Sequence, residues 1–313
     1  MLDVRDIPEL DRKKGASTLE RVRLEDVRDP EGPSFAAAYA LLDSFFGPQG
    51  ELEARETLQR FVRSPILDFG GGAVGIYHLV AVWAGDQLVG VRDCYVDIDA
   101  AHGVCVVVLS HSLVVPEWRR TGLAAVLRAL PVTIARAALA ERGLELPTIV
   151  AAEMEPVDPA VPETIVRMVA YGRSGFLVAD PRRFRYSQPD FRELQGAAHG
   201  ALPLLGVIRP VNLPPGDLPL EVALAYPRMF HACHRTYLAE DRVAPSHAHF
   251  LAHVGDGPVP LLPLPTGGDT LDRLAPLVRG AVLPLYPRAL QGPDASHGDP
   301  AAELAGVRAM WRR

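Results

Sequence analysis

The stretch VVPEWRRTGLAAVLRAL, Val114 to Leu130, runs from strand-like apolar residues through a turn with two arginines and a glycine into a helix-forming segment. The first amides of a helix have no intrahelical partner and carry a partial positive charge, so they attract anions. Gly122 lets a ligand approach closely because it has no Cβ, and Arg119 and Arg120 add forked donors suited to phosphate oxygens. The stretch therefore predicts a pyrophosphate site.

An ordinary strand-to-helix turn with two solvated arginines is the alternative interpretation of so short a pattern. Two motifs at separate places favour the ligand site. Arg119, Gly122 and Ala124 satisfy R-x-x-G-x-A, and Tyr171 stands four residues before Gly175-Phe176 in the pattern Y-x-x-x-G-F. Together with the order of the predicted elements, the two motifs resemble the GCN5-related N-acetyltransferase (GNAT) superfamily.

This resemblance covers about residues 34–188, roughly half of the chain. It implies an α/β (α+β) fold with a mixed, mostly antiparallel, splayed sheet flanked by helices, and acyl-coenzyme A bound in the gap of the sheet. Acetyl-CoA or another acyl-CoA is then the expected co-substrate, and no metal is expected. The sequence departs from the family at Arg120, where a glycine or another small residue is frequent, and at Pro131 in the following helix.

The resemblance also assigns roles to residues of both motifs. The backbone of Val114 and Val115 is expected to pair with the pantetheine arm. Tyr171 is expected to act as the general acid toward the thiolate leaving group; a helix tyrosine bonded to a backbone carbonyl is the structural alternative. The residues expected to hold the pyrophosphate are Arg119, Arg120, Thr121, Gly122, Leu123 and Ala124.

Acyl transfer to an amine also needs a base, because only the neutral nitrogen attacks. The resemblance does not fix this residue. Glu153 and Glu155 follow the predicted strand IVAA, where the gap of the sheet is expected to open, and Glu153 is favoured as the nearer one. A solvated surface position is the alternative for each glutamate.

Three polar residues interrupt a long apolar strand and are candidates for lining the pocket. Period-two alternation sends Ser110 and Ser112 to one face of the strand and His111 to the other. A structural histidine with satisfied ring nitrogens is the favoured interpretation of His111.

The hydrophobic periodicity predicts two helices, three antiparallel strands, a helix, a strand, a helix and a strand in that order. Pro131 is expected to kink or break the helix that follows the three strands, near Ala129 and Leu130. The expected division is an N-terminal arm at 1–33, a GNAT-like acyl-CoA-binding domain at 34–195 and a Pro-rich C-terminal region of unknown role at 196–313. That region is expected to begin with a connector and to hold a helix from Leu220 to about Glu240.

The charge balance gives no reason to expect nucleic acid as a partner, since 32 Lys and Arg oppose 38 Asp and Glu for a net charge of −6. The three cysteines lack an activating context. The first residues are charged, and no apolar run reaches the roughly 18 residues of a membrane span. The sequence thus predicts a cytoplasmic protein without a membrane partner, and a homodimer is compatible with it.

Two further patterns in the sequence suggest other ligands. Gly70, Gly72 and Gly75 match the dinucleotide motif G-x-G-x-x-G, but a strand follows them instead of a helix, so the motif loses its mechanism. Six metal-ligand side chains gather in the segments FHACHRTY and SHAHFLAHV without a standard zinc spacing, so packing or surface positions are the favoured interpretation. They are His231, Cys233, His234, His247, His249 and His253.

The sequence therefore predicts an acyl-CoA-dependent N-acyltransferase, with acetyl transfer as the expected form and an amine as the acceptor. The alternatives are a non-catalytic acyl-CoA-binding or interaction protein on the same fold, and another acyl-thioester reaction.

Overall fold

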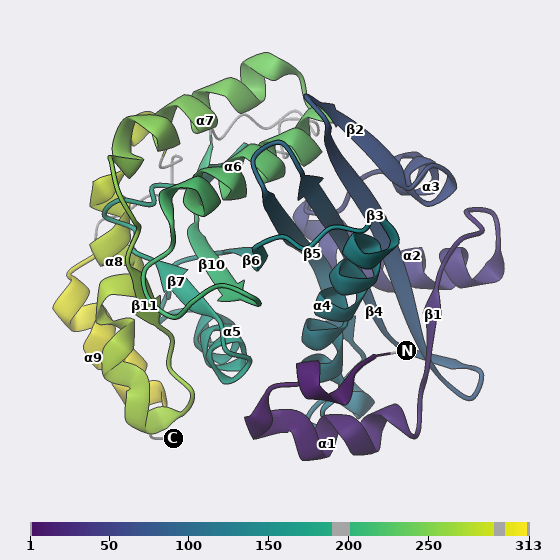
Figure 1. Cartoon of the computed structure of the whole chain (residues 1–313). Coiled ribbons are helices and arrows are strands. Elements are labelled where there is room, and N and C mark those ends of the chain that lie inside the picture. Colours follow the sequence, from purple (N-terminus) through teal and green to yellow (C-terminus); the bar gives the residue numbers. More distant parts are fainter. Residues whose placement is uncertain (1, 190–200, 291–297, 312–313) are drawn as a thin grey trace. The chain divides into compact units, whose positions relative to one another are not determined.

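A computed structural model describes residues 2–189, 201–290 and 298–311 of the chain (Figure 1). The chain divides into two compact units, Met1–Val150 and Ala151–Arg313. The division falls inside strand β6 (Thr148–Met154). This place differs from the domain boundaries expected from composition, which stay a prediction.

The first unit is built around a meander of long antiparallel strands. The sheet order is β1-β3-β4-β5, and β2 pairs with β3 beside β1. The strands are β1 (Arg23–Asp26), β2 (Ile66–Gly70), β3 (Ala73–Ala84), β4 (Gln87–Asp99) and β5 (Val104–Val114). The helices are α1 (Glu9–Leu19), α2 (Pro33–Phe46), α3 (Arg55–Arg63) and α4 (Leu123–Glu141), with short 3₁₀ turns η1 (Val4–Asp6), η2 (Gly47–Gln49) and η3 (Pro116–Trp118). The predicted meander and helices are confirmed, whereas β2 was not expected.

Helices cover both faces of this meander (Figure 1). Val80 and Val82 of β3 share a buried cluster with Leu127 of α4. Tyr77, an odd number of residues away on β3, points to the other face, where its ring lies 5.5 Å from that of Phe61 in α3. A mostly antiparallel sheet flanked by helices is the fold class that the sequence predicts.

Residues 1–33 are more than an arm. Leu2 and Ile7 belong to the buried cluster under α4, and β1 pairs with β3. The sequence does not reveal this packing, because the charged residues of α1 surround the few apolar and small residues on the face that packs against α4. Gly15, buried in α1, lies so close to the Ile7 side chain that a Cβ would stand 2.9 Å from its Cδ1.

Helix α4 continues through Pro131, so of the expected kink or break the break is wrong, and the kink stays a prediction. A proline has no amide hydrogen to donate to the carbonyl four residues earlier, here that of Leu127. The structure supplies another donor, because Nε of the buried Arg92 donates to the Leu127 oxygen at 3.3 Å and its Nη1 donates to the His111 carbonyl at 3.3 Å. The side chain of Arg92 thus compensates for the hydrogen bond that Pro131 removes.

The compensation predicts a measurable coupling between the two residues. In Pro131→Ala, the restored amide can bond to Leu127, so the substitution Arg92→Met is expected to cost about 1 kcal/mol less there than in the wild-type background. Urea unfolding of the wild type, both single variants and the double variant measures the coupling free energy. Additive free energies of unfolding would contradict the assigned role of Arg92.

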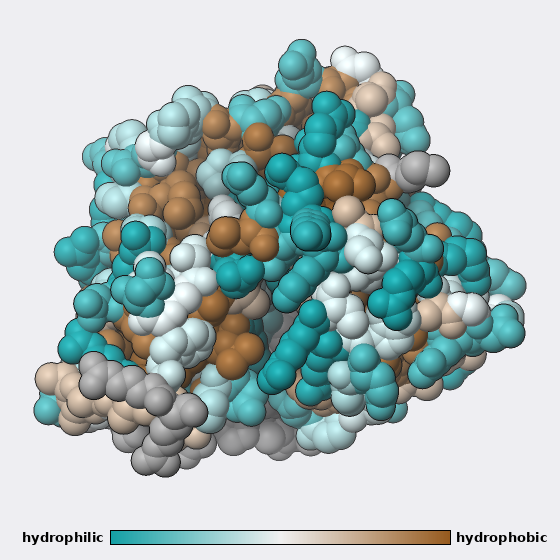
Figure 2. Space-filling view, turned by 90° about the horizontal axis from the view of Figure 1, so that it is seen from below, coloured by the Kyte–Doolittle hydropathy of each residue, from teal (hydrophilic) through white to brown (hydrophobic). Residues whose placement is uncertain are grey.

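By length and composition α4 could cross a membrane, but 61% of its most apolar window is buried inside the structure. Burial of this kind is typical of the core helix of a globular unit. Large exposed apolar side chains elsewhere in the first unit include Leu10 and Ile66. On the face shown in Figure 2, hydrophobic residues form several groups between hydrophilic ones.

The second unit starts with the end of β6, and its sheet order is β6-β10-β7-β11. Its strands are β7 (Leu177–Ala179), β8 (Ser187–Gln188), β9 (Leu202–Pro203), β10 (Leu205–Pro210) and β11 (Leu261–Pro263). Its helices are α5 (Pro162–Arg173), α6 (Leu220–Arg235), α7 (Glu240–Val254), α8 (Arg279–Val282) and α9 (Pro300–Trp311), with 3₁₀ segments η5 (Gly268–Leu277), η6 (Leu283–Leu285) and η7 (Arg288–Leu290).

The Pro-rich segment that follows Gly196 was expected to be a connector, and this is wrong for Leu205–Pro210. This stretch forms β10 and pairs with β7. Of the prolines in this segment, Pro203 precedes the strand, Pro210 ends it and the others follow it, so the residues between keep their amides for the ladder. The helix expected from Leu220 is confirmed, and it ends at Arg235.

Candidate functional site

The predicted pyrophosphate loop joins β5 to α4 in the first unit. After Val114 the chain makes the single turn η3, extends at Arg119 and enters α4 at Leu123. Gly122 is the N-cap of the helix, with a left-handed φ of 106°. The hydroxyl of Thr121 donates to the Trp118 carbonyl at 2.7 Å and accepts from the amide of Leu123 at 3.3 Å. The loop is therefore a closed turn with α4 starting directly behind it.

Arg120 stands out in the backbone. Its φ of 64° is the only positive value for a non-glycine residue in the part of the chain that the structure describes. A left-handed residue with a Cβ costs about 1–2 kcal/mol, which explains why a glycine is easier to place there. Both Arg119 and Arg120 are exposed, so the loop presents two guanidinium groups to solvent.

Val114 and Val115 differ in their backbone contacts. The amide of Val115 donates to the Val89 carbonyl at 3.1 Å, and its carbonyl accepts from the Trp118 amide at 3.0 Å. The carbonyl of Val114 accepts a long bond of 3.5 Å from Nε of Arg119. The amide of Val115 is already used inside the unit, so of the predicted pantetheine partners Val114 fits better.

Gly122 serves a different contact from the one expected. A Cβ at this position would lie 2.7 Å from the carbonyl carbon of Lys14 and 2.8 Å from the amide nitrogen of Gly15. The sequence analysis expected the absence of a Cβ at Gly122 to leave room for a ligand. In the structure the backbone of α1 occupies that space. The glycine allows two helices to meet at the loop.

Glu153 lies on β6 in the second unit, and both of its carboxylate oxygens are hydrogen-bonded. The hydroxyl of Tyr186 donates to Oε1, and Nε2 of Gln188 donates to Oε2 at 2.7 Å. Next to it the hydroxyl of Tyr226 donates to the Ala152 carbonyl at 2.7 Å. Burial raises the pKa of Glu153 to about 7, although the two donors act in the opposite direction. A carboxylate with this pKa exchanges a proton near neutral pH, as a general base requires.

Glu155 has a different environment. It lies beyond the end of β6, is about half exposed and forms an ion pair with Arg167 of α5. Its carboxylate is occupied by a guanidinium at the surface, whereas that of Glu153 is buried among hydrogen-bond donors. The geometry of the second unit thus favours Glu153 of the two candidates.

Tyr171 is placed by the end of α5. Gly175, with a left-handed φ of 77°, lets the chain turn back so that the Phe176 amide donates to the Tyr171 carbonyl at 3.1 Å. The two rings meet edge to face, with centroids 4.8 Å apart. The motif Y-x-x-x-G-F therefore works as a helix stop that fixes the tyrosine ring, and the ring is partly exposed.

A buried polar cluster in the first unit was only partly predicted. Asp93 of β4 accepts from the His111 amide at 2.6 Å and from the Tyr77 hydroxyl at 3.1 Å. The His111 ring lies 3.3 Å from Asp93 through Nδ1, 2.8 Å from the Glu51 carbonyl and 3.9 Å from Glu53 through Nε2. Burial opposes the charge on His111, but Asp93 and Glu53 outweigh it and raise its pKa to about 10. His111 is thus a satisfied, protonated histidine.

The register of β4 and β5 shifts beside this cluster, between Arg92 and Cys94. The simple alternation expected for Ser110, His111 and Ser112 does not hold across such an irregularity. The amide of His111 bonds to the Asp93 carboxylate instead of a β4 carbonyl. The sequence pointed to the serines and the histidine but did not pair Asp93 with them, because a carboxylate in a neighbouring strand gives no periodic signal.

The histidines of the second unit lie on α6 and α7. Nδ1 of His231 lies 3.1 Å from Nδ1 of His247, and the rings of His249 and His253 share a face of α7 with centroids 4.3 Å apart. Within the described residues no group of three or more His, Cys, Asp or Glu side chains is arranged to hold a metal ion. The dinucleotide pattern at Gly70 leads into β3, a strand.

No family model and no curated protein matches the chain. Solved structures similar to it include an acetyltransferase of the GNAT family from Streptococcus pneumoniae, with 12% identity over 60% of this chain and 97% of that one and a TM-score of 0.36. Another is the ribosomal-protein-S18-alanine N-acetyltransferase from Escherichia coli, with 16% identity, coverage of 62% and 96%, and a TM-score of 0.34. A third is yncA from Salmonella typhimurium with its cofactor acetyl-CoA, at 12% identity, coverage of 62% and 95%, and a TM-score of 0.34.

Proposed function

We propose that this chain is an N-acyltransferase that moves an acyl group, in the first place acetyl, from acyl-coenzyme A to an amine. The neutral amine attacks the thioester carbonyl directly, the new C–N bond forms, and the C–S bond breaks to release coenzyme A as its thiolate. Glu153 takes the proton of the amine, directly or through a water, and Tyr171 gives a proton to the thiolate.

The observation that carries this proposal is the loop from β5 to α4. It combines a glycine-capped helix start with two exposed arginines in a chain of net charge −6. Helix starts and guanidinium groups both favour phosphate oxygens. The motif R-x-x-G-x-A at this place therefore has the chemistry that a pyrophosphate requires.

The cysteines support direct attack over a covalent acyl-enzyme. Cys94, Cys105 and Cys233 are all buried. Burial raises the pKa values of Cys94 and Cys105 to about 12. A thiol with such a pKa is protonated at neutral pH and is a poor nucleophile.

Calorimetric titration with acetyl-CoA tests the proposed site. The double variant Arg119→Ala, Arg120→Ala removes two charge-assisted phosphate contacts and is expected to weaken binding by about tenfold or more. Arg63→Ala is the matched control, because Arg63 is an exposed arginine at the end of α3 that pairs with Glu31. This variant is expected to bind acetyl-CoA as the wild type does.

Two outcomes would count against the proposal in different ways. Wild-type affinity in the double variant contradicts the pyrophosphate site. Tight binding without release of coenzyme A thiol in the presence of any of a panel of primary amines identifies an acyl-CoA-binding protein instead of an enzyme.

A further inference from the structure

Helix α1 lies against the pyrophosphate loop, although about a hundred residues separate the two in sequence. Besides the contact of Lys14 and Gly15 with Gly122, the hydroxyl of Thr18 donates to the Thr121 carbonyl at 2.8 Å. The guanidinium of Arg21, just after α1, lies 4.8 Å from the centre of the Trp118 ring. Three successive turns of this N-terminal segment thus touch the loop.

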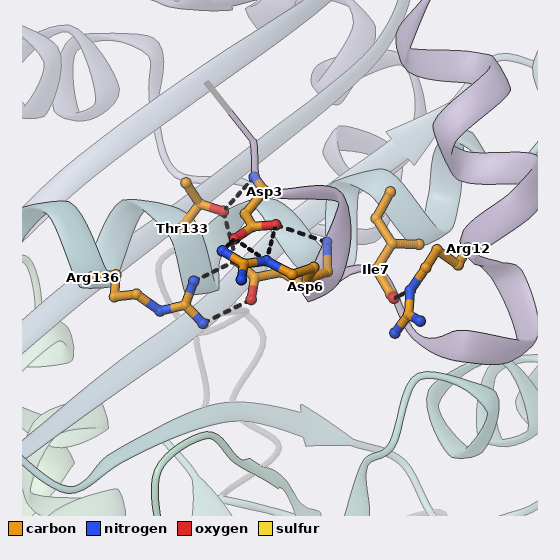
Figure 3. A network of polar contacts seen from close by, with 7 residues as sticks. Asp3, Asp6, Ile7, Arg12, Thr133 and Arg136 are labelled. Carbon is orange, nitrogen blue, oxygen red and sulfur yellow. Dashed lines mark hydrogen bonds and ion pairs between the residues drawn. The ribbon is translucent and has the colours of Figure 1, made fainter.

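The position of α1 is fixed at its other end as well. Figure 3 shows Asp6 accepting from Nη1 and Nη2 of Arg136 at 3.0 and 2.8 Å and from the Thr133 hydroxyl at 2.9 Å. The amide of Asp3 donates to the same hydroxyl at 3.4 Å. The turn before α1 is thus bonded to α4, and α1 itself is bonded to the loop that precedes α4, so α1 is held beside the loop.

This contact brings additional positive charge to the loop. Lys13 and Lys14 are exposed on α1, and within the described ranges no carboxylate forms an ion pair with Lys14. The Cβ of Lys14 lies 2.9 Å from the place where a Cβ of Gly122 would be. Its side chain therefore starts at the N-cap of α4, next to the arginines at 119 and 120.

Coenzyme A carries more negative charge than the positive groups of the loop alone can balance. Its pyrophosphate carries two negative charges, and its ribose 3′-phosphate, a monoester, adds about 1.5 to 2 at neutral pH. The helix start and two arginines suit the pyrophosphate, whereas a lysine is a compact point charge suited to a solvent-facing monoester. We propose that α1 completes the coenzyme site and that Lys14 binds the 3′-phosphate, which makes the protein select coenzyme A over 3′-dephospho-coenzyme A.

This inference rests on the proposed function, and one pair of ligands tests both. Calorimetry at low salt compares coenzyme A with 3′-dephospho-coenzyme A in the wild type, where the phosphorylated form is expected to bind roughly fivefold tighter, the value of one exposed charge pair. Lys14→Gln is expected to weaken binding of coenzyme A alone and to abolish the preference. Lys13→Gln, whose side chain leaves the helix about 100° away, is the control and is expected to keep it.

The outcomes separate the two proposals. If the wild type binds neither ligand, the proposed function fails and this inference fails with it. If it binds both with equal affinity, or if Lys14→Gln weakens both alike, the proposed function stands and the role of Lys14 is refuted. Loss of the preference in Lys13→Gln to the same degree also refutes it, since the effect would then be the general charge of α1. Circular dichroism confirms that each variant keeps its helix content.

Discussion

Replacement of Glu153 by Gln is expected to lower the turnover number by about 10²- to 10⁴-fold, the usual contribution of a general base. The amide keeps the size of the side chain and can still accept from Tyr186, but it cannot take a proton from the amine. Affinity for acetyl-CoA is expected to stay unchanged, because the pyrophosphate loop belongs to other residues. Thiol release from acetyl-CoA, with a primary amine that the wild type accepts, measures the loss.

The matched change Glu155→Gln sharpens the test, because this glutamate is two residues away, half exposed and paired with Arg167. It is expected to leave turnover nearly unchanged. A turnover number for Glu153→Gln close to that of the wild type would rule out the assigned role of this carboxylate.

The pH dependence of the wild type gives a second readout of Glu153. Its carboxylate has to be ionised to act as a base, and burial raises its pKa to about 7, so kcat/KM is expected to rise with pH until Glu153 is ionised. Tyr186→Phe removes a hydrogen bond that favours the ionised form, so the rise is expected to move to higher pH. A profile that stays in place in Tyr186→Phe would contradict the assignment.

Acid is expected to destabilise the second unit through its buried histidines. Burial, together with the nearby His247 and Arg235, lowers the pKa of His231 to about 3, and burial lowers that of His234 well below its ordinary value. Below a pH of about 6.5 the unfolded chain binds protons that the folded protein does not bind. The free energy of unfolding is therefore expected to fall as the pH drops from about 6.5 toward 3, by up to about 1.4 kcal/mol per pH unit for each such histidine.

Urea unfolding between pH 7 and pH 4 checks this dependence, and the slope is more informative than the absolute stability. His231→Asn removes one buried imidazole and is expected to flatten the slope, whatever its effect on stability at pH 7. The control is His102→Asn, which removes a side chain that is 58% exposed on a turn of the first unit. An unchanged slope in His231→Asn would show that His231 does not contribute.

The loop from β5 to α4 could be predicted because its information is local. An apolar strand, two arginines, one glycine and a helix-forming run follow each other within Val114–Leu130, and each acts on its neighbours. The same holds for the stop of α5 at Gly175. In both cases the turn chemistry is fixed by residues a few positions apart.

The contacts that could not be predicted join distant parts of the sequence. Gly122 meets Lys14, and Arg92 reaches the carbonyl that Pro131 leaves without a donor. Neither pair has a spacing that a periodic pattern could reveal. The lack of an amide hydrogen on Pro131 predicts the missing hydrogen bond, but it does not predict which side chain replaces that bond.

Glu153 and Glu155 show the same limit within the second unit. They are two residues apart, so alternation along an extended chain gives both the same direction. The two glutamates differ because Tyr186 and Gln188, more than thirty residues away, donate hydrogen bonds to Glu153 and not to Glu155.

The packing of the first 26 residues decides how this protein can be shortened for experiments. A fragment that starts at Pro33, where the sequence composition changes, would leave the edge of β3 without β1 and the apolar face of α4 without Leu2 and Ile7. Arg136 would lose the carboxylate of Asp6 at the same time. Fragments meant to retain coenzyme binding therefore have to include the N-terminal helix, and an affinity tag is better placed away from Leu2.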